Sequence, residues 1–488
     1  MADDRTLTPR AEDFSAWYNE LVLRAELADH SPVRGSMVIR PWGYGIWENM
    51  QRALDDMFKA TGHENAYFPL LIPMSFIERE KEHVEGFKPE LAVVTHAGGK
   101  ELEEPLVIRP TSETVIYSMF AKWVQSYRDL PILMNQWANV MRWELRTRLF
   151  LRTSEFLWQE GHTAHASEPE AEEETRRMLE VYRQFMQDWI AMPVVTGLKS
   201  ESEKFAGALR TYTCEAMMQD GKALQAGTSH NLGQNFSKQF ELTFQNEEGV
   251  EAFAWNTSWG VSTRLVGGLV MTHGDDDGLV LPPRLAPVQV VVVPIFRKEE
   301  ERTAVVERAH QIRSRLQEAG VRVRVDDRDH LNPGAKFWEW ERKGVPLRIE
   351  IGPRDLAKNQ VVLVRRVTPE GADRKAFLDE NEALASIPGR LEEFQRYLLE
   401  RAVESREARS HRGVNSIEEL QALVDAPGGG FVYTGWSGDP EVERRIQETT
   451  KATLRCIPDP AFRSETPPER CIGGDAPSKM EVVWAKAY

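Results

Sequence analysis

Arginine, glutamate and aromatic side chains gather in one stretch of this chain, between residues 137 and 162. Alternating apolar and polar residues predict two strands there, joined by an arginine-rich turn. Arg142 and Glu144 lie two positions apart, so on a strand both side chains point to the same face. An arginine can bind phosphate oxygens, a carboxylate can accept adenine amino hydrogens, and a ring such as Phe156 can stack on the base. An antiparallel hairpin with a solvated arginine turn explains these residues equally well.

Helical periodicity and strand signals predict the elements that would hold these side chains. Apolar residues recur at helical spacing over residues 44–61, and Gly62 follows as a stop signal. An apolar strand is predicted over residues 66–72, ending at Pro73. This helix and strand are typical of an ordinary core, and a dimer interface explains them as well. Residues 168–190 predict a charged amphipathic helix on an outer face.

Two further segments contain candidate ligand-binding groups. Thr111 and Glu113 stand where a helix begins, a position that favours such side chains in any protein, but their oxygens could also turn toward a bound ammonium group. Residues 203–207 and 225–233 are rich in small residues and predict loops that a ligand can approach closely. His230 lies in the second of these loops, and a lone histidine is more often structural.

The sequence does not supply a full set of metal ligands. His162 and His165 have no cysteine or third spaced histidine beside them, whereas zinc takes three or four ligands. The acidic run at residues 273–278 lacks the alternating ligands and terminal glutamate of a calcium loop, so it predicts a turn. Three cysteines without CxxC spacing supply no disulfide framework.

Composition is that of a globular chain with about two to four domains. Hydrophobic residues make up 41% and charged residues 28% of the 488 positions. There is no apolar run long enough to span a bilayer and no signal-peptide pattern at the start, so the expected location is the cytoplasm, away from membranes. A net charge of −15 argues against indiscriminate coating of nucleic acid, but a local basic face stays open.

These segments together resemble a known family. The helix and strand ending at Pro73, the stretch from Arg142 to Phe156, and the glycine-flanked Arg264 resemble motifs 1, 2 and 3 of class II aminoacyl-tRNA synthetases, in the family's order. Four shorter segments narrow the resemblance to prolyl-tRNA synthetase, in the form shared by archaea, eukaryotes and some bacteria: 111–113, 203–207, 227–230 and 256–260. The match covers nearly the whole chain.

The resemblance implies three domains and a two-step reaction. An α+β catalytic domain, an antiparallel sheet flanked by helices, is expected over residues 1–285. An α/β anticodon-binding domain is expected over 286–400 and a small α+β domain over 401–488. ATP with Mg²⁺ would activate L-proline to prolyl-adenylate, and the prolyl group would pass to tRNA(Pro). A homodimer formed through the motif 1 helix is also implied.

The resemblance also implies roles for individual residues. Arg142 would bind the α-phosphate and the substrate carboxylate, and Arg264 the far phosphates. Glu144 would hold the adenine amino group and Phe156 would stack on the ring. The rest of the nucleotide site would be Arg152, Thr153, Gln225, Thr228 and Ser262. The proline site would consist of Arg142 with Thr111, Glu113, Trp158, Glu160, Phe205 and His230, and the carboxylate of Glu113 would pair with the secondary ammonium.

Beyond residue 287 the pattern changes to alternating strands and helices, which predicts a small domain with a parallel or mixed sheet. Basic residues gather there, as on many solvated faces. By resemblance, Glu341 and Arg348 would read anticodon bases, and Lys336 and Arg354 would contact the RNA backbone.

Two features of the family are missing. The segment between motifs 2 and 3 has no room for the editing domain of the other bacterial form, so no hydrolysis of alanyl-tRNA within this chain is expected. The third domain commonly holds zinc through four cysteines, but here residues 435–440 replace the first pair and only Cys471 is kept from the second. We therefore expect no structural zinc, and packing through Phe431, Trp436 and Trp484 in its place.

Two alternatives remain open. One is a synthetase-like protein that senses proline or RNA without catalysis, although it would not need all of Arg142, Glu144 and Arg264. The other is a class II ligase for another amino acid, such as threonine or glycine. Threonine-specific sites of this class use a catalytic zinc, and the sequence supplies no ligand set for it.

Overall fold

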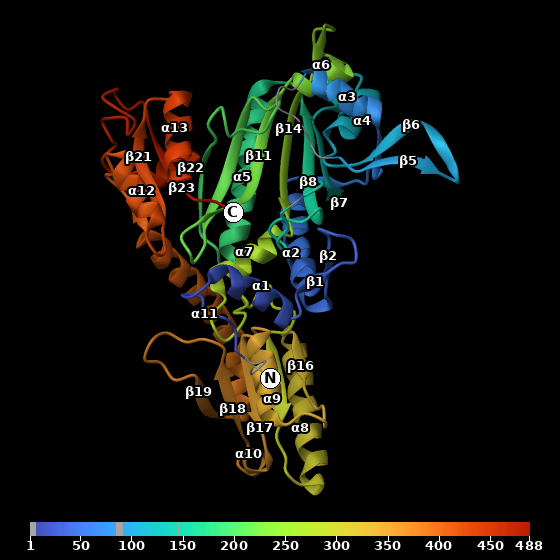
Figure 1. The fold of residues 1–488 in the computed structure, drawn as a ribbon. Helices are drawn as coiled ribbons and strands as arrows, with labels where there is room; N and C mark the ends of the chain where they lie inside the picture. Colours follow the sequence, from blue (N-terminus) through green and yellow to red (C-terminus); the bar gives the residue numbers. More distant parts are fainter. Residues whose placement is uncertain (1–5, 84–90, 145) are drawn as a thin grey trace.

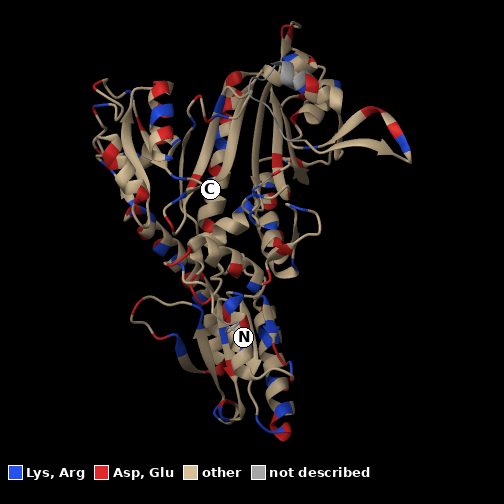
Figure 2. Cartoon of the chain, viewed as in Figure 1, with Lys and Arg blue, Asp and Glu red and all other residues tan. Residues whose placement is uncertain are grey.

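The computed structural model describes residues 6–83, 91–144 and 146–488. A large sheet with its helices forms the centre, a five-stranded domain lies at one end, and the C-terminal residues pack beside the large sheet (Figure 1). Lysine, arginine and acidic residues are frequent along the outer helices, whereas the central strands carry few of them (Figure 2). Among the described residues, no helix is both long and apolar enough to cross a membrane.

The central sheet has eleven strands, and most neighbours pair antiparallel. In spatial order the strands are β20 (Ser410–His411), β21 (Phe431–Trp436), β23 (Met480–Ala485), β22 (Thr453–Pro458), β9 (Val194–Leu198), β10 (Arg210–Met217), β11 (Ala223–Gly233), β14 (Trp255–Ser262), β8 (Glu155–His165), β7 (Ile132–Met141) and β3 (Glu64–Asn65). The C-terminal strands therefore extend the central sheet through β22 and β9, where Ile457 pairs with Leu198 and Pro458 with Gly197.

Helices cover the central sheet because each has one apolar face. In α2 (Pro41–Ala60) the residues Ile46, Met50, Leu54 and Phe58 are buried at helical spacing, as the sequence predicts. This helix contacts α5 and α7, so its apolar face belongs to the core of its own chain. The other helices of this part are α1 (Phe14–Arg24), α3 (Met74–His83), α4 (Glu113–Trp123), α5 (Glu168–Asp188), α6 (Asn235–Phe240) and α7 (Arg264–His273).

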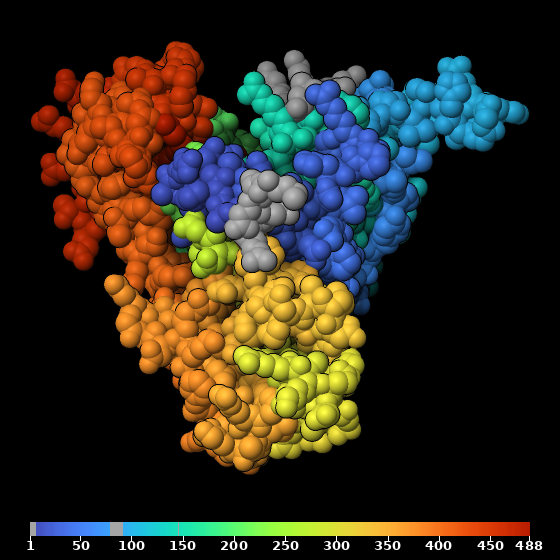
Figure 3. Space-filling model, turned by 60° about the horizontal axis from the view of Figure 1, so that its bottom comes forward, coloured from blue at the N-terminus to red at the C-terminus, as the bar shows by residue number. Residues whose placement is uncertain are grey.

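Three small sheets and one short helix complete this part. They are β1 (Ala28–His30) with β2 (Met37–Ile39), β12 (Thr243–Gln245) with β13 (Glu251–Phe253), β4 (Leu71–Pro73) with β6 (Lys100–Ile108) and β5 (Val93–Ala97), and the 3₁₀ helix η1 (Tyr127–Asp129). The β5–β6 hairpin projects away from the body of the molecule (Figures 1 and 3).

The five-stranded domain has the mixed sheet that the sequence predicts. Its strands, in spatial order, are β16 (Val323–Val325), β15 (Val290–Pro294), β17 (Leu347–Ile351), β18 (Gln360–Arg365) and β19 (Lys375–Asp379). The first three run parallel and the last two antiparallel. The helices are α8 (Glu299–Glu318), α9 (Pro333–Arg342), α10 (Pro353–Ala357) and α11 (Glu380–Glu407). The expected division at residue 400 falls inside α11.

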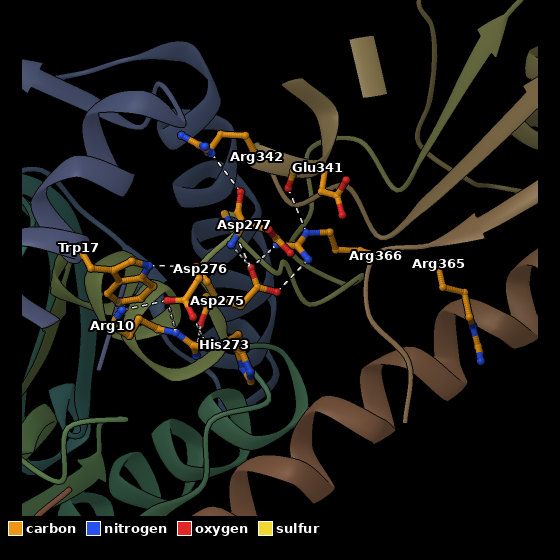
Figure 4. A network of polar contacts seen from close by, with 12 residues as sticks. Arg10, Trp17, His273, Asp275, Asp276, Asp277, Glu341, Arg342, Arg365 and Arg366 are labelled. Atoms are coloured by element: carbon orange, nitrogen blue, oxygen red, sulfur yellow. Dashed lines mark hydrogen bonds and ion pairs between the residues drawn. The ribbon is translucent and has the colours of Figure 1, made fainter. Parts of the chain in front are cut away.

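The acidic turn after α7 joins the five-stranded domain to the part of the molecule built on the central sheet (Figure 4). The carboxylate of Asp275 accepts hydrogen bonds from both terminal nitrogens of Arg366, at 2.8 and 2.5 Å. The Nε of Arg342 donates to the carbonyl of Asp277 at 3.0 Å, and the Nε of Arg366 donates to the carbonyl of Glu341 at 3.0 Å. The turn predicted from the sequence thus has a structural role, and its acids pair with arginines.

The C-terminal part is held together by apolar packing. Phe431, Trp436 and Trp484 are buried, as expected: Trp436 and Trp484 pack with α12 (Ile417–Asp425) and α13 (Pro440–Thr450), whereas Phe431 packs on the other face of β21. The 3₁₀ helix η2 (Pro460–Phe462) follows β22. Cys456 and Cys471 are buried as free thiols. In the part of the chain that the structure describes, no three histidine, cysteine or acidic side chains stand together as a metal site would require.

Two predictions about local structure are wrong. Residues 66–70 form no strand, because the Phe68 amide donates to the side chain of Gln136 at 2.6 Å and not to a neighbouring strand. Residues 225–233 form no loop and belong to β11. The small residues there reflect packing, since a Cβ on Gly227 would lie 2.8 Å from Val261.

The junction between β9 and β22 leaves no room for a side chain at Gly197. A Cβ there would lie 2.3 Å from the carbonyl oxygen of Ile457. We expect Gly197→Ala to destabilise the chain by about 1–3 kcal/mol, because the two strands must separate. Differential scanning calorimetry will show a lower Tm. Gly389→Ala is the matched control, since a Cβ there meets nothing within 4 Å in the helix α11. An unchanged Tm for Gly197→Ala would contradict the close junction.

Candidate active site

A cavity of about 250 Å³ opens beside strands β8, β11 and β14, between the first residues of α4 and α7. Most of the residues proposed from the sequence line it: Thr111, Glu113, Arg142, Phe156, Trp158, Glu160, Phe205, Gln225, Thr228, His230, Ser262 and Arg264. Residues from the beginning and the middle of the chain thus meet in one place.

Arg142 lies at the cavity wall, directly after β7. Its Nε donates to the carbonyl of Pro110 at 2.9 Å, and its guanidinium lies over the rings of Phe156 and Trp158, 5.6 and 5.5 Å from their centres. The side chain is exposed to the cavity, although protein surrounds it on the other sides. Burial lowers the pKa of Arg142, and the charges of Glu113 and Glu160 act in the opposite direction.

Arg264 is the first residue of α7 and lines the same cavity. Its closest hydrogen bonds go to the carbonyls of Leu151 and Gln225, at 3.3 and 3.4 Å, which are long for charged donors. Burial and then the charges of Arg142 and Arg152 lower the pKa of Arg264 to about 10, so it still carries its charge at neutral pH. Among the described residues, no carboxylate forms an ion pair with Arg142 or Arg264. The cavity therefore concentrates positive charge that an anion would neutralise.

A second group of side chains supplies negative charge to the same cavity. The carboxylate of Glu160 accepts hydrogen bonds from Ser112 at 2.5 Å and Gln136 at 2.7 Å, and lies 3.0 Å from the Nε2 of His162. Burial opposes its ionisation, but these partners bring the pKa of Glu160 below its ordinary value. Thr111 donates to the carboxylate of Glu113. Both acids are buried and face the cavity.

His230 is held as a neutral group. The hydroxyl of Thr211 lies 2.9 Å from its Nδ1, and its ring lies 4.8 Å from the ring of Phe205. Burial, with a smaller effect of His162, lowers the pKa of His230 to about 3. The imidazole therefore contributes hydrogen bonding and packing, without a charge.

Three proposed nucleotide-site residues lie outside the cavity lining. Glu144 does not share a strand face with Arg142, because β7 ends at Met141. Its carboxylate pairs with the Nε of Arg152 at 2.5 Å. Thr153 donates to the carbonyl of Glu155 at 2.7 Å. The expected common face on a strand is therefore wrong for Arg142 and Glu144.

Sequence reasoning missed several lining residues: His162, Glu203, Thr211 and Ser258. The alternation along β8 could have indicated His162, since it is two residues from Glu160 on the same strand.

The four anticodon candidates do not come together. Glu341 and Arg348 line one small hollow of the five-stranded domain, where Glu341 pairs with Arg374 at 2.5 Å. Arg354 is exposed at the start of α10. Lys336 is only 2% exposed, and its amine donates to the carbonyl of Asp326 at 3.0 Å. The buried amine cannot meet RNA in this conformation.

Three family models match the chain in succession. Residues 92–273 match the tRNA synthetase class II core domain (G, H, P, S and T). Residues 289–380 match the anticodon binding domain, and residues 417–488 match the prolyl-tRNA synthetase C-terminal domain. These matches follow the order of the three parts of the fold: the part built on the central sheet, the five-stranded domain and the C-terminal part.

Full-length relatives carry one name. A proline–tRNA ligase of Chlorobium phaeobacteroides is 57% identical over 100% of both chains, and one of Chloroherpeton thalassium is 56% identical over 99% of both. A chloroplastic/mitochondrial proline–tRNA ligase of Arabidopsis thaliana is 53% identical over 100% of this chain and 89% of its own length. The chain therefore belongs to the prolyl-tRNA synthetase family of class II aminoacyl-tRNA synthetases, and its activity is the ligation of proline to tRNA.

Proposed function

We propose that the cavity around Arg142 and Arg264 is where L-proline meets ATP and where prolyl-adenylate forms. The observation that supports this most strongly is the positive charge of two arginines that share one cavity and have no carboxylate bound to either among the described residues. A triphosphate supplies the missing negative charge. In-line attack on phosphorus requires positioning and charge neutralisation more than a covalent group on the enzyme.

Arg142 stands between the two groups that react. The charges of Glu113 and Glu160 act on its guanidinium, and it lines the same cavity as Arg264. We assign it to the proline carboxylate and the α-phosphate together, which brings the attacking oxygen to phosphorus. Arg264 takes the far phosphates, and Mg²⁺ enters with ATP as the substrate complex. Gln225, Thr228 and Ser262 line the wall beside them.

The proline ring occupies the other end of the cavity in this proposal. The carboxylate of Glu113, oriented by Thr111, binds the secondary ammonium group. Trp158, Phe205 and neutral His230 form the walls around the ring, and Glu160 completes the floor. Such a pocket excludes larger side chains, but discriminates against a substrate smaller by one methylene by only about 1–3 kcal/mol.

The adenine end extends past the cavity. Phe156 stacks on the base, and the Glu144–Arg152 pair, with Thr153 behind it, lies where the base would leave the cavity. The carboxylate of Glu144 would then exchange one contact with Arg152 for the adenine amino group.

We propose that the three functional units are residues 1–285, 286–400 and 401–488, and that the enzyme works in the cytoplasm as a homodimer without structural zinc. Support for the dimer comes from large side chains exposed along the motif 1 segment, since Tyr44 is 41%, Tyr67 71% and Leu71 38% exposed. For tRNA(Pro), we assign the reading of anticodon bases to Glu341 and Arg348, which line one hollow. Exposed Arg354 would contact the RNA backbone, and Lys336 would do so only after its amine is released from the carbonyl of Asp326.

The reaction is tested by ATP–pyrophosphate exchange with each amino acid in turn. We expect exchange with proline, and a loss of at least about 100-fold in Arg142→Ala, because one group positions both reactants. Arg146→Ala, an exposed arginine of the same turn, is the control and keeps its activity. Exchange with no amino acid on folded protein would leave a sensor, and exchange led by another amino acid would overturn the pocket.

The neutral state of His230 is tested by nitrogen-15 NMR between pH 8 and 5. We expect no protonation of its ring, because its pKa in the fold is about 3. The unfolded chain binds this proton near pH 6.5, so the stability of the fold decreases as pH drops from 6.5 toward 3. His230→Gln loses less stability than the wild type over that range. A ring that titrates near pH 6.5 would contradict the assignment.

The dimer is tested by light scattering after size-exclusion chromatography. Tyr67→Asp introduces a charge on the motif 1 segment, so we expect the wild type to be dimeric and this variant monomeric. Phe377→Asp is the matched control, because Phe377 is 70% exposed on the distant strand β19. If Tyr67→Asp elutes with the mass of the wild-type dimer, the interface lies elsewhere.

A further inference from the structure

One loop contributes two residues to the cavity lining and is bound by residues of the C-terminal part. Residues 199–207 connect β9 to β10 and bring Glu203 and Phe205 to the cavity. The Phe205 amide donates to the hydroxyl of Thr211 at 2.9 Å, and that hydroxyl contacts His230. The position of this loop therefore decides where the Phe205 ring stands against His230.

Glu443 of α13 binds this loop directly. Its side chain is only 3% exposed, and one carboxylate oxygen accepts hydrogen bonds from Ser200 at 2.8 Å and Ser202 at 2.6 Å. The two hydroxyls also lie 3.1 Å apart. A buried carboxylate that binds two hydroxyls of one loop fixes both residues of that loop at once.

Arg455 of β22 provides a second attachment. Its Nε and Nη2 bind one oxygen of Glu215 at 3.0 and 2.9 Å, and the amine of Lys199 binds the other oxygen at 2.9 Å. Glu215 is fully buried. The charges of Arg455 and Lys199 bring its pKa below the ordinary value in spite of burial. Lys199 is the first residue of the loop, so Arg455 fixes the point where the loop leaves β9.

The charges at these contacts also affect the pKa values of residues that line the cavity. Burial raises the pKa of Glu203 above its ordinary value, and the charges of Lys199 and Arg455 act against this. The charge of Arg455 also contributes to lowering the pKa of Arg264. A residue of the C-terminal part is therefore close enough to affect both ends of the cavity.

We propose that Glu443 and Arg455 are positioning residues that hold loop 199–207 closed over the amino-acid pocket, so that the C-terminal part controls the affinity for proline and the preference for proline over alanine. This inference rests on the function proposed for the cavity. When the contacts are lost, only a fraction of molecules has Phe205 in place, and the apparent affinity falls by that fraction. Alanine lacks the ring that Phe205 contacts, so its binding depends less on the loop.

The experiment is ATP–pyrophosphate exchange with proline and with alanine on four full-length variants and on the combination of the first two. Glu443→Ala removes the acceptor, and Ser200→Ala with Ser202→Ala removes both donors from the loop side without changing the C-terminal part. Glu443→Gln keeps an acceptor oxygen. Glu448→Ala, an exposed acid of the same helix, is the matched control.

We expect the KM for proline to rise about 5- to 20-fold in Glu443→Ala and in the double serine variant, with the KM for ATP within about twofold of the wild type. The ratio of kcat/KM for proline to that for alanine falls. Combining Glu443→Ala with the two serine substitutions raises the KM for proline little further, because both changes break the same contact. Glu443→Gln recovers most of the affinity, and Glu448→Ala behaves as the wild type.

Several outcomes would overturn the proposal. A wild-type KM for proline in the folded serine variant would do so. Equal decreases of kcat/KM for proline, alanine and ATP would do so too, because they indicate a smaller fraction of active enzyme. If Glu443→Ala does not fold, the serine variant decides, since it removes only two hydroxyls. A wild type without proline-dependent exchange refutes the function of the cavity itself, whereas normal exchange with unchanged variants refutes only the loop's attachment.

Discussion

The structure depends on keeping two arginines charged in a cavity where no carboxylate of the described chain is bound to them. Arg142 and Arg264 are held by backbone carbonyls, aromatic rings and long hydrogen bonds, and burial, followed by the charges of Arg142 and Arg152, lowers the pKa of Arg264 to about 10. This arrangement costs stability in the free enzyme. The large sheet and the apolar core around α2, α5 and α7 supply the rigidity that keeps the arginines in place.

The same constraint explains the distribution of acids. Hydroxyl and amide donors from Ser112 and Gln136, together with His162, lower the pKa of Glu160 in spite of its burial, and Thr111 donates to the carboxylate of Glu113. In the proposed function, the acids Glu113 and Glu160 bind the ammonium group and the two arginines bind phosphates, and all four side chains line one cavity.

Much of this site could be predicted from the sequence, because the arginines, acids and rings lie in short motifs with recognisable spacing. The alternation around residues 137–162 predicts the β7–β8 hairpin correctly. It places Arg142 and Glu144 on one strand face wrongly, because β7 ends at Met141. What could not be predicted depends on contacts between distant segments. Lys199 and Glu215 acquire a role only when Arg455 is placed beside them, and the pairing of β22 with β9 has no local signal. Lys336 appears basic and available in the sequence, but its amine is turned inward.

The C-terminal part is joined to the rest of the molecule by its sheet, by packing and by ion pairs. Its strands continue the catalytic sheet, and its buried tryptophans and the ion pairs of Arg455 join it to the enzyme.

The central claim, that Arg264 neutralises the far phosphates while Arg142 serves both substrates, is tested most directly by titration calorimetry of ATP with Mg²⁺ and of proline into Arg264→Met. The account predicts that the variant loses at least about tenfold in affinity for ATP, corresponding to about 1.4 kcal/mol, and keeps its affinity for proline. Unchanged binding of ATP by a folded Arg264→Met variant would contradict it.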